Sequence, residues 1–205
     1  ERYWKGLCFL LRNSGLCARK LYRCRDKITL LLYRREELEQ WLKTLQVEAL
    51  LKELGYTAVI FSVTEKISEA PVSFHANQIN MLDKETMLKA GDVFFYGSHT
   101  HNLHFLKGRH SALVAADRVT VEADLRESLA ALQAYPSAVP FLFSYPYGNY
   151  SDAVEAVLRE NGVKLAFRAY KGRFTRESNA FELPRYPVSF SVSFKTFQGY
   201  FAEHL

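Results

Sequence analysis

The chain has 205 residues, 48% of them hydrophobic, which suffices for one domain with a sizeable core but not for two comfortable domains. No run of 18 apolar residues occurs, so the sequence predicts no membrane span, and the chain opens on Glu1 without a recognisable signal peptide. The net charge of +5 is unevenly distributed, because residues 1–35 hold ten Lys and Arg against two Asp and Glu (+8), and the remainder holds 17 against 20 (−3).

Residues 1–35 differ in composition from the rest of the chain. They contain all three cysteines, Cys8, Cys17 and Cys24, at a spacing that fits no usual zinc pattern, and an odd number cannot pair completely within one chain. Three interpretations of this segment remain open: a basic surface-binding arm, a poorly ordered terminus, or sequence damaged by a frame error or gene degeneration. It shows no interleaved aromatic platform and no recognised nucleic-acid-binding module, so no nucleic-acid partner is expected. We therefore divide the chain into this anomalous segment and a single domain over residues 36–205.

Strand-like and helix-like patterns alternate along residues 36–205. Asp83 and Asp117 are suited to cap the helices that follow them, and Gly55 and Gly162 are natural helix stops. In chain order we expect helix 36–54, strand 57–63, helix 84–90, strand 93–96, helix 118–133, strand 139–143, helix 151–160 and strand 163–167. Repeated strand-helix units predict a parallel sheet with helices outside, in an α/β fold whose closure would give a barrel.

Four of the six histidines fall between positions 99 and 110, directly after the strand expected at 93–96. His99 and His104 are five residues apart, a spacing that brings both side chains onto one ion only in an irregular loop. Neutral imidazole is a common metal ligand, and a catalytic zinc-type site keeps one position for water. The alternative is a polar loop whose histidines face solvent.

A second motif follows about forty residues later. The strand expected at 139–143 runs into Ser144-Tyr145-Pro146-Tyr147-Gly148, and the two motifs occur in the order "SHTHNLH" and "FSYPYGNYS". Together they resemble the polysaccharide deacetylases of carbohydrate esterase family 4, in particular the branch that includes bacterial poly-N-acetylglucosamine deacetylases. The resemblance covers about residues 45–195 and implies a single distorted, incomplete (β/α) barrel with both motifs at the carboxyl ends of strands.

The resemblance also implies a reaction and a set of residue roles. Members of this family hydrolyse N-acetyl groups of a β-linked N-acetylglucosamine polymer with a divalent metal, usually zinc, so this polysaccharide is the expected partner, and the expected state is a monomer at the cell envelope or outside the cell. His99 and His104 match the metal histidines, whereas His101 lies where the family is variable and is expected to be solvated and not a ligand. Tyr147 matches the residue whose main-chain N–H completes the oxyanion hole, in a turn fixed by Pro146 and Gly148.

Roles are less sharply assigned for three further residues. Arg185 matches late-strand residues that orient an active-site carboxylate, with a structural or surface role as the alternative. Tyr145 and Tyr150 are candidates for stacking on sugar faces, with side-chain packing as the alternative.

The sequence departs from the family at its first motif. That motif ends in Asp-Asp, which supplies the catalytic base and the third metal ligand, and no Asp-Asp occurs anywhere in this chain. Glu36, Glu37 or Glu39 could supply a carboxylate, although they are more simply read as favourable charges at a helix start. The late motif that supplies the general acid is not identifiable either. We therefore expect impaired activity, and the alternative function is that of a catalytically inactive glycan-binding relative.

Overall fold

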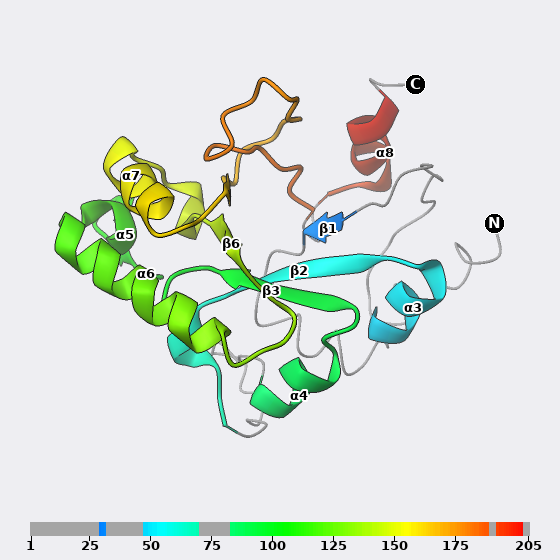
Figure 1. Cartoon of the computed structure of the whole chain (residues 1–205). Helices are drawn as coiled ribbons and strands as arrows, with labels where there is room; N and C mark the ends of the chain where they lie inside the picture. Colours follow the sequence, from blue (N-terminus) through cyan, green and yellow to red (C-terminus); the bar gives the residue numbers. More distant parts are fainter. Residues whose placement is uncertain (1–28, 32–46, 70–82, 189–191, 203–205) are drawn as a thin grey trace.

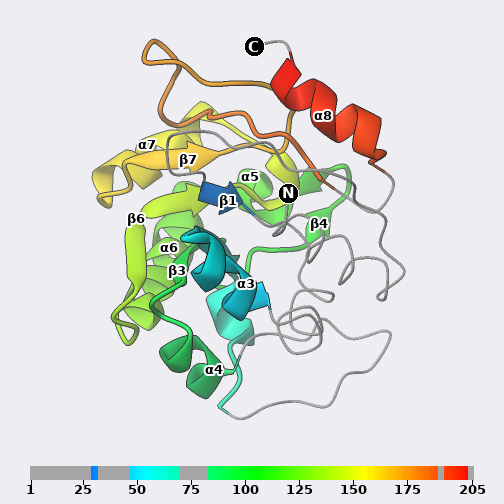
Figure 2. The ribbon, with the colours of Figure 1, turned by 90° about the vertical axis from the view of Figure 1, so that its right-hand side faces the viewer.

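A five-stranded parallel sheet organises the computed structural model, which describes residues 29–31, 47–69, 83–188 and 192–202 (Figure 1). The strand order is β1-β2-β3-β6-β7, and the sheet curls into part of a barrel, as Figure 2 shows from the side. The strands are β1 (Thr29–Leu31), β2 (Thr57–Ser62), β3 (Phe94–Ser98), β6 (Ala138–Ser144) and β7 (Leu165–Phe167). The expected α/β fold, an incomplete (β/α) barrel, is confirmed.

Helices and short turns connect these strands and cover the sheet. Figure 1 shows α5, α6 and α7 grouped on one side of the molecule, with α3 and α4 on the other. These elements are α3 (Val47–Leu54), η1 (Thr64–Lys66), α4 (Lys84–Lys89), the hairpin β4 (Leu106–Lys107) and β5 (His110–Ser111), α5 (Ala112–Ala115), α6 (Arg118–Leu132), η2 (Pro146–Gly148), α7 (Asp152–Glu160) and α8 (Phe194–Ala202). No helix in the described part of the chain is long and apolar enough to span a membrane.

The helix starts follow the capping residues expected from the sequence. The Asp83 and Asp117 carboxylates accept hydrogen bonds from the backbone N–H groups of Thr86 and Thr120, at 2.8 and 2.9 Å. Ser151 caps α7 in the same way, by accepting from the N–H of Val154. Val121 and Leu125 of α6 are buried in one core cluster with residues of α7 and β6. This packing fixes α6 against the sheet.

Strand β1 lies inside the segment 1–35, which was expected to stand apart from the sheet. Thr29, Leu30 and Leu31 instead pair in parallel with Thr57, Ala58 and Val59 of β2. The division of the chain at residue 35 stays a prediction, and β1 adds a strand to the sheet from the amino-terminal side of that division. The other residues of the segment, including its three cysteines, lie outside the described residues, as do Glu36, Glu37 and Glu39 and the first part of the helix expected at 36–54.

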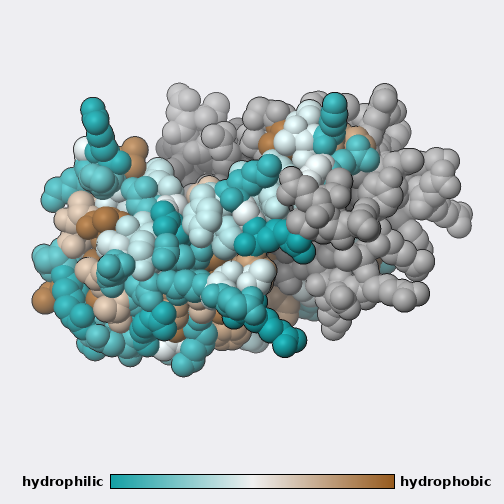
Figure 3. Space-filling view, turned by 90° about the horizontal axis from the view of Figure 1, so that it is seen from above, coloured by the Kyte–Doolittle hydropathy of each residue, from teal (hydrophilic) through white to brown (hydrophobic). Residues whose placement is uncertain are grey.

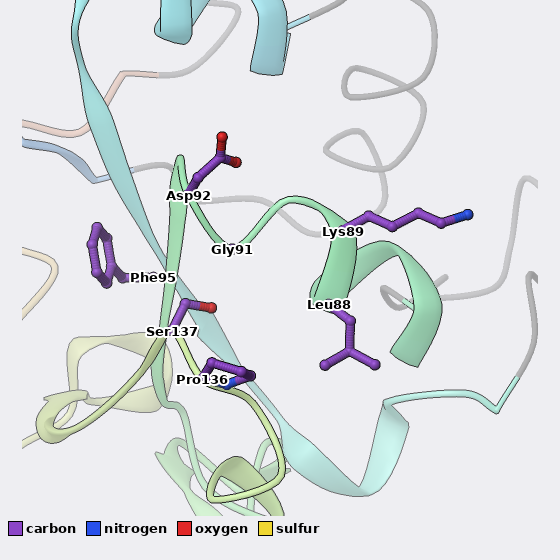
Figure 4. Close-up of a pocket in the computed structure, with 7 residues that line it drawn as sticks. All are labelled: Leu88, Lys89, Gly91, Asp92, Phe95, Pro136 and Ser137. Carbon is purple, nitrogen blue, oxygen red and sulfur yellow. The ribbon is translucent and has the colours of Figure 1, made fainter.

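The surface visible in Figure 3 is mostly hydrophilic where it is described, with apolar side chains in small separate patches. A hollow of about 370 Å³ lies at the amino-terminal end of β3, where α4 meets the segment before β6 (Figure 4). It is lined by Leu88, Lys89, Gly91, Asp92, Phe95, Pro136 and Ser137. The histidine motif follows the opposite, carboxyl-terminal end of β3, so this hollow is separate from the candidate site.

Candidate active site

His99 follows β3 directly and is held at the carboxyl ends of three neighbouring strands. Its side chain is buried, with 5% of its surface exposed. Its backbone N–H donates to the carbonyl oxygen of Ser62 at the end of β2, at 2.9 Å. Its ring Nδ1 lies 2.6 Å from the carbonyl oxygen of Ser144 at the end of β6. The parallel register, which pairs Ser98 with Phe143, brings these chain positions together.

The contact between His99 and Ser144 determines which ring nitrogen carries the proton. A carbonyl oxygen can only accept, so a contact of this length requires a proton on Nδ1. A neutral His99 then carries its lone pair on Nε2. Hydrogen bonding of one imidazole nitrogen to a backbone carbonyl is the usual way in which proteins orient a metal-binding histidine.

His104 and Tyr147 complete a cluster of three rings with His99. The ring centroids of His99 and His104 are 4.7 Å apart, and those of His104 and Tyr147 are 4.9 Å apart in a stacked arrangement. The Tyr147 hydroxyl also donates to the carbonyl oxygen of His104, at 3.5 Å. The structure therefore brings together the three residues that the two sequence motifs single out, although they come from loops about forty residues apart.

Tyr147 lies in a turn with a left-handed backbone. Its φ is 56° and its ψ is 10°, and Gly148 follows with φ 70°. The N–H groups of Gly148 and Asn149 donate back to the carbonyl oxygens of Tyr145 and Pro146. The turn is anchored from outside because the Asn149 side chain accepts the backbone N–H of Ser111 at 2.7 Å. Tyr147 itself remains 40% exposed.

Glycine is the residue type that this turn accommodates easily at position 148. A β-carbon at this position would lie 2.7 Å from the β-carbon of Ala169 and 2.8 Å from its backbone nitrogen. The expected role of Gly148 in fixing the turn is consistent with this close approach. Pro146 is buried at the first position of η2, where its fixed φ suits the turn.

The Tyr145 side chain packs in the core, which was the alternative to stacking on a sugar. Its side chain is fully buried in the core cluster between Phe143 and Tyr150, with edge-on ring contacts to both. A ring in this position cannot stack on a sugar, so the expected substrate-binding role of its side chain is corrected. Burial also raises the pKa of its hydroxyl far above the ordinary value.

Arg185 and His101 are held by local contacts. The Arg185 Nε donates to the carbonyl oxygen of Arg168, just after β7, at 2.8 Å, and its catalytic role stays a prediction. His101 was expected to be solvated, but its Nδ1 lies 3.0 Å from the Thr64 hydroxyl and its Nε2 lies 3.3 Å from a Glu127 carboxylate oxygen. His101 is therefore a structural part of the loop between His99 and His104.

Asp124 is a buried site residue that the sequence did not reveal as one. Its carboxylate accepts the backbone N–H groups of His101, Asn102 and Leu103. Burial raises the pKa of this carboxyl, and the three N–H donors act in the opposite direction. The available signal was its position, because Asp124 lies three residues after Val121, on the inward face of α6.

Two imidazoles fit part of the ligand set of a zinc-type ion. The described residues contain no group of three or more His, Cys, Asp and Glu side chains placed to hold a metal. His99, oriented by the carbonyl of Ser144, and His104, stacked on Tyr147, are the described residues that could bind such an ion. A third His, Cys, Asp or Glu ligand would have to come from outside the described residues.

The family of the chain is clear from sequence comparison. The family model of polysaccharide deacetylase matches residues 42–166, more than half of the chain, and the chain belongs to this family. A second model, described as a protein of unknown function, matches residues 5–72.

Individual relatives are similar over part of their length. The poly-beta-1,6-N-acetyl-D-glucosamine N-deacetylase of Staphylococcus aureus strain MSSA476 is 30% identical over 142 residues, which are 68% of this chain and 48% of that protein. The protein of the same name from strain MRSA252 is 29% identical over the same length. The chain thus spans about half the length of these curated relatives.

Solved structures share the fold at low sequence identity. IcaB from Ammonifex degensii superposes with a TM-score of 0.70 at 15% identity, covering 97% of this chain and 87% of that one. The Streptococcus pyogenes deacetylase PplD, solved in complex with acetate, gives a TM-score of 0.67 at 15% identity, covering 95% and 76%. At this identity the likeness shows the fold alone.

Proposed function

We propose that this chain is a metal-dependent hydrolase that removes N-acetyl groups from a β-linked N-acetylglucosamine polymer, with zinc as the metal. The observation that carries the proposal is the cluster of His99, His104 and Tyr147 at the carboxyl ends of the strands. The family of the chain and the names of its Staphylococcus relatives support the proposed reaction and the proposed polymer. We further propose that it acts as a monomer at the cell envelope.

The residues of the chain have separate roles in this proposal. When bound, the ion would polarise the acetamide oxygen and lower the pKa of a water molecule. His99 and His104 would hold the ion, and the contact with Ser144 keeps the His99 ring in one orientation. Pro146 has no N–H, and the N–H groups of Gly148 and Asn149 already donate within the turn. We therefore assign the oxyanion donor to the Tyr147 N–H.

The absence of the Asp-Asp motif lowers the expected rate of deacetylation. In the family, one Asp of the first motif is the base and the other a metal ligand, and the chain contains no Asp-Asp. A general base typically contributes about 10² to 10⁴-fold to a rate. We therefore expect weak metal binding through the two histidines and slow turnover. Turnover at the rate of ordinary family members would point to Glu36 or Glu37 as a substitute base.

The test measures deacetylation of β-1,6-linked N-acetylglucosamine oligomers by the full chain, with and without added zinc or cobalt. We expect slow, metal-dependent release of acetate that His99→Ala and His104→Ala abolish. His110→Ala is the matched control, because His110 is an exposed histidine of the neighbouring hairpin, and it should leave the rate unchanged.

Two results would overturn the proposal. Acetate release that survives both histidine substitutions would remove the metal site from the reaction. Absence of release, together with oligomer binding that Tyr147→Ala weakens, would establish the alternative of an inactive glycan-binding relative.

A further inference from the structure

A single carboxylate holds the backbone between the two candidate metal histidines. Asp124 Oδ2 accepts the N–H of His101 at 2.8 Å, and its Oδ1 accepts the N–H groups of Asn102 and Leu103 at 2.8 and 3.1 Å. These three donors are consecutive, and they lie between His99 and His104. Asp124 itself is 7% exposed and lies in the middle of α6, a helix of 15 residues. The support is therefore rigid.

The loop that Asp124 holds has an unfavourable backbone. Thr100 is fully buried and has a φ of 77°, a conformation that a β-branched residue rarely adopts. Such a residue persists only where its surroundings fix it from several sides. The carbonyl oxygens of Thr100 and His101 accept the N–H groups of Thr64 and Glu65, from the turn after β2, each at 3.1 Å. Asp124 accepts hydrogen bonds from the N–H groups of the same loop, so the loop is held through both its carbonyl and its N–H groups.

Helix α6 holds the end of β3 at a second point. One turn after Asp124, the Ser128 hydroxyl lies 2.8 Å from the hydroxyl of Ser98, the last residue of β3, and both side chains are buried. The same helix thus fixes the backbone on both sides of His99. An ionised acceptor forms stronger hydrogen bonds than a neutral one, so Asp124 is the stronger of these two anchors.

We propose that Asp124 is a positioning residue that sets the conformation of the loop between His99 and His104 and, through it, the metal affinity of the chain. The second half of this inference rests on the proposed function. Asp124 acts through its hydrogen bonds to the backbone of the loop, so its effect on a metal is indirect. The structure predicts that loss of its hydrogen bonds releases the His104 side of the loop, because Leu103 directly precedes His104.

The test compares Asp124→Asn and Asp124→Ala with the wild-type full chain. Asparagine keeps the size but has one acceptor oxygen in place of two, so it cannot accept from both sides, and alanine accepts from none. We measure zinc affinity by calorimetric titration and the visible absorption spectrum of bound cobalt. Loss of outer partners at metal sites typically weakens affinity by about 10 to 100-fold. We expect about tenfold for Asp124→Asn, a larger loss for Asp124→Ala, and an altered cobalt spectrum for both.

Asp117→Ala is the matched control for stability. Asp117 caps the same helix by accepting the Thr120 N–H, and its contacts lie at the start of α6, away from the loop. A variant that merely loosens α6 would therefore resemble Asp117→Ala. Equal zinc affinity and an unchanged cobalt spectrum in the wild type and both Asp124 variants would overturn the proposal, as would an equal loss in Asp117→Ala.

Hydrogen exchange separates this inference from the proposed function. The amides of His101, Asn102 and Leu103 should exchange faster in the Asp124 variants and at the wild-type rate in Asp117→Ala, with no metal present. If the wild type bound no zinc, or if His99→Ala bound it as well as the wild type does, the proposed metal site would fail. The exchange rates would still decide whether Asp124 fixes the loop, and unchanged rates would overturn that role.

Discussion

The imidazole Nδ1 of His99 and the carbonyl oxygen of Ser144 are 2.6 Å apart, across the boundary between the two motifs. This contact joins the end of β3 to the end of β6, so the ring orientation of His99 depends on the strand that leads into Pro146-Tyr147-Gly148. Because a backbone carbonyl supplies it, no side-chain substitution at position 144 removes it directly. The first prediction separates this contact from metal binding.

We expect His99→Asn to keep the fold but lose the metal. The Asn side chain has an amide donor near the position of Nδ1, so the contact with Ser144 is retained, and removal of Nε2 takes away the ligand atom. Zinc affinity should fall about 100-fold or more, since loss of outer partners alone costs about 10 to 100-fold. The free energy of unfolding should fall by only about 1 kcal/mol. Zinc titration together with urea unfolding checks both parts, and unchanged zinc affinity would rule out His99 as a ligand.

Gly148 and Gly162 provide a matched pair for the turn after β6. Both have positive φ, at 70° and 87°, but only at Gly148 would a β-carbon meet another residue, Ala169, at under 3 Å. Alanine in the left-handed region costs about 1–2 kcal/mol at either site. At Gly148 the clash adds about 1–3 kcal/mol, as overpacking usually does. Urea unfolding should show Gly148→Ala as clearly the less stable variant, and equal stabilities would contradict the close approach.

Local elements were predictable from the sequence because their signals are local. The capping residues Asp83 and Asp117 and the apolar spacing in α6 depend only on neighbours within a few positions, and the structure places those helices as expected. The hairpin of β4 and β5 was missed, because two-residue strands carry too little pattern to be recognised. Strand β1 was missed as part of the sheet because the composition of its surroundings obscured it.

The site was predictable only in part, for a different reason. The two motifs indicated His99, His104 and Tyr147 through resemblance, and the sequence correctly placed them after two strands. Asp124, the left-handed backbone of Thr100 and the bonded state of His101 depend on contacts between residues 21 to 37 positions apart. No periodic pattern encodes such contacts. The one sign of Asp124 in the sequence was an aspartate at an inward-facing position of the expected helix.

Tyr145→Phe should leave the protein at least as stable as the wild type. The Tyr145 hydroxyl is buried and accepts or donates no hydrogen bond among the described residues, so its removal relieves a desolvation cost of about 1–3 kcal/mol. We expect an unfolding free energy that is unchanged or higher. Because the ring lies in the core, affinity for N-acetylglucosamine oligomers should not change. A marked loss of stability in urea unfolding would mean that the hydroxyl has a partner outside the described residues.

The contribution of Asp117 to stability should depend on pH in a defined direction. The backbone N–H of Thr120 and then its hydroxyl hold the pKa of the Asp117 carboxyl below its ordinary value of 3.8. The folded state therefore binds this proton less readily than the unfolded state, and the stabilisation is fully present above pH 3.8. It is lost as the pH falls through the lower, folded-state pKa.

Urea unfolding of the wild type, Asp117→Ala and Asp117→Asn from pH 7 down to pH 2 checks this. The wild type should exceed Asp117→Ala in stability at pH 7, and the difference should shrink in acid because a protonated carboxyl is a weaker acceptor for the Thr120 N–H. Asparagine caps helices well and does not titrate in this range, so the difference between Asp117→Asn and Asp117→Ala should stay constant. A wild-type advantage that persisted unchanged at pH 2 would show that the charge of Asp117 contributes nothing to the cap.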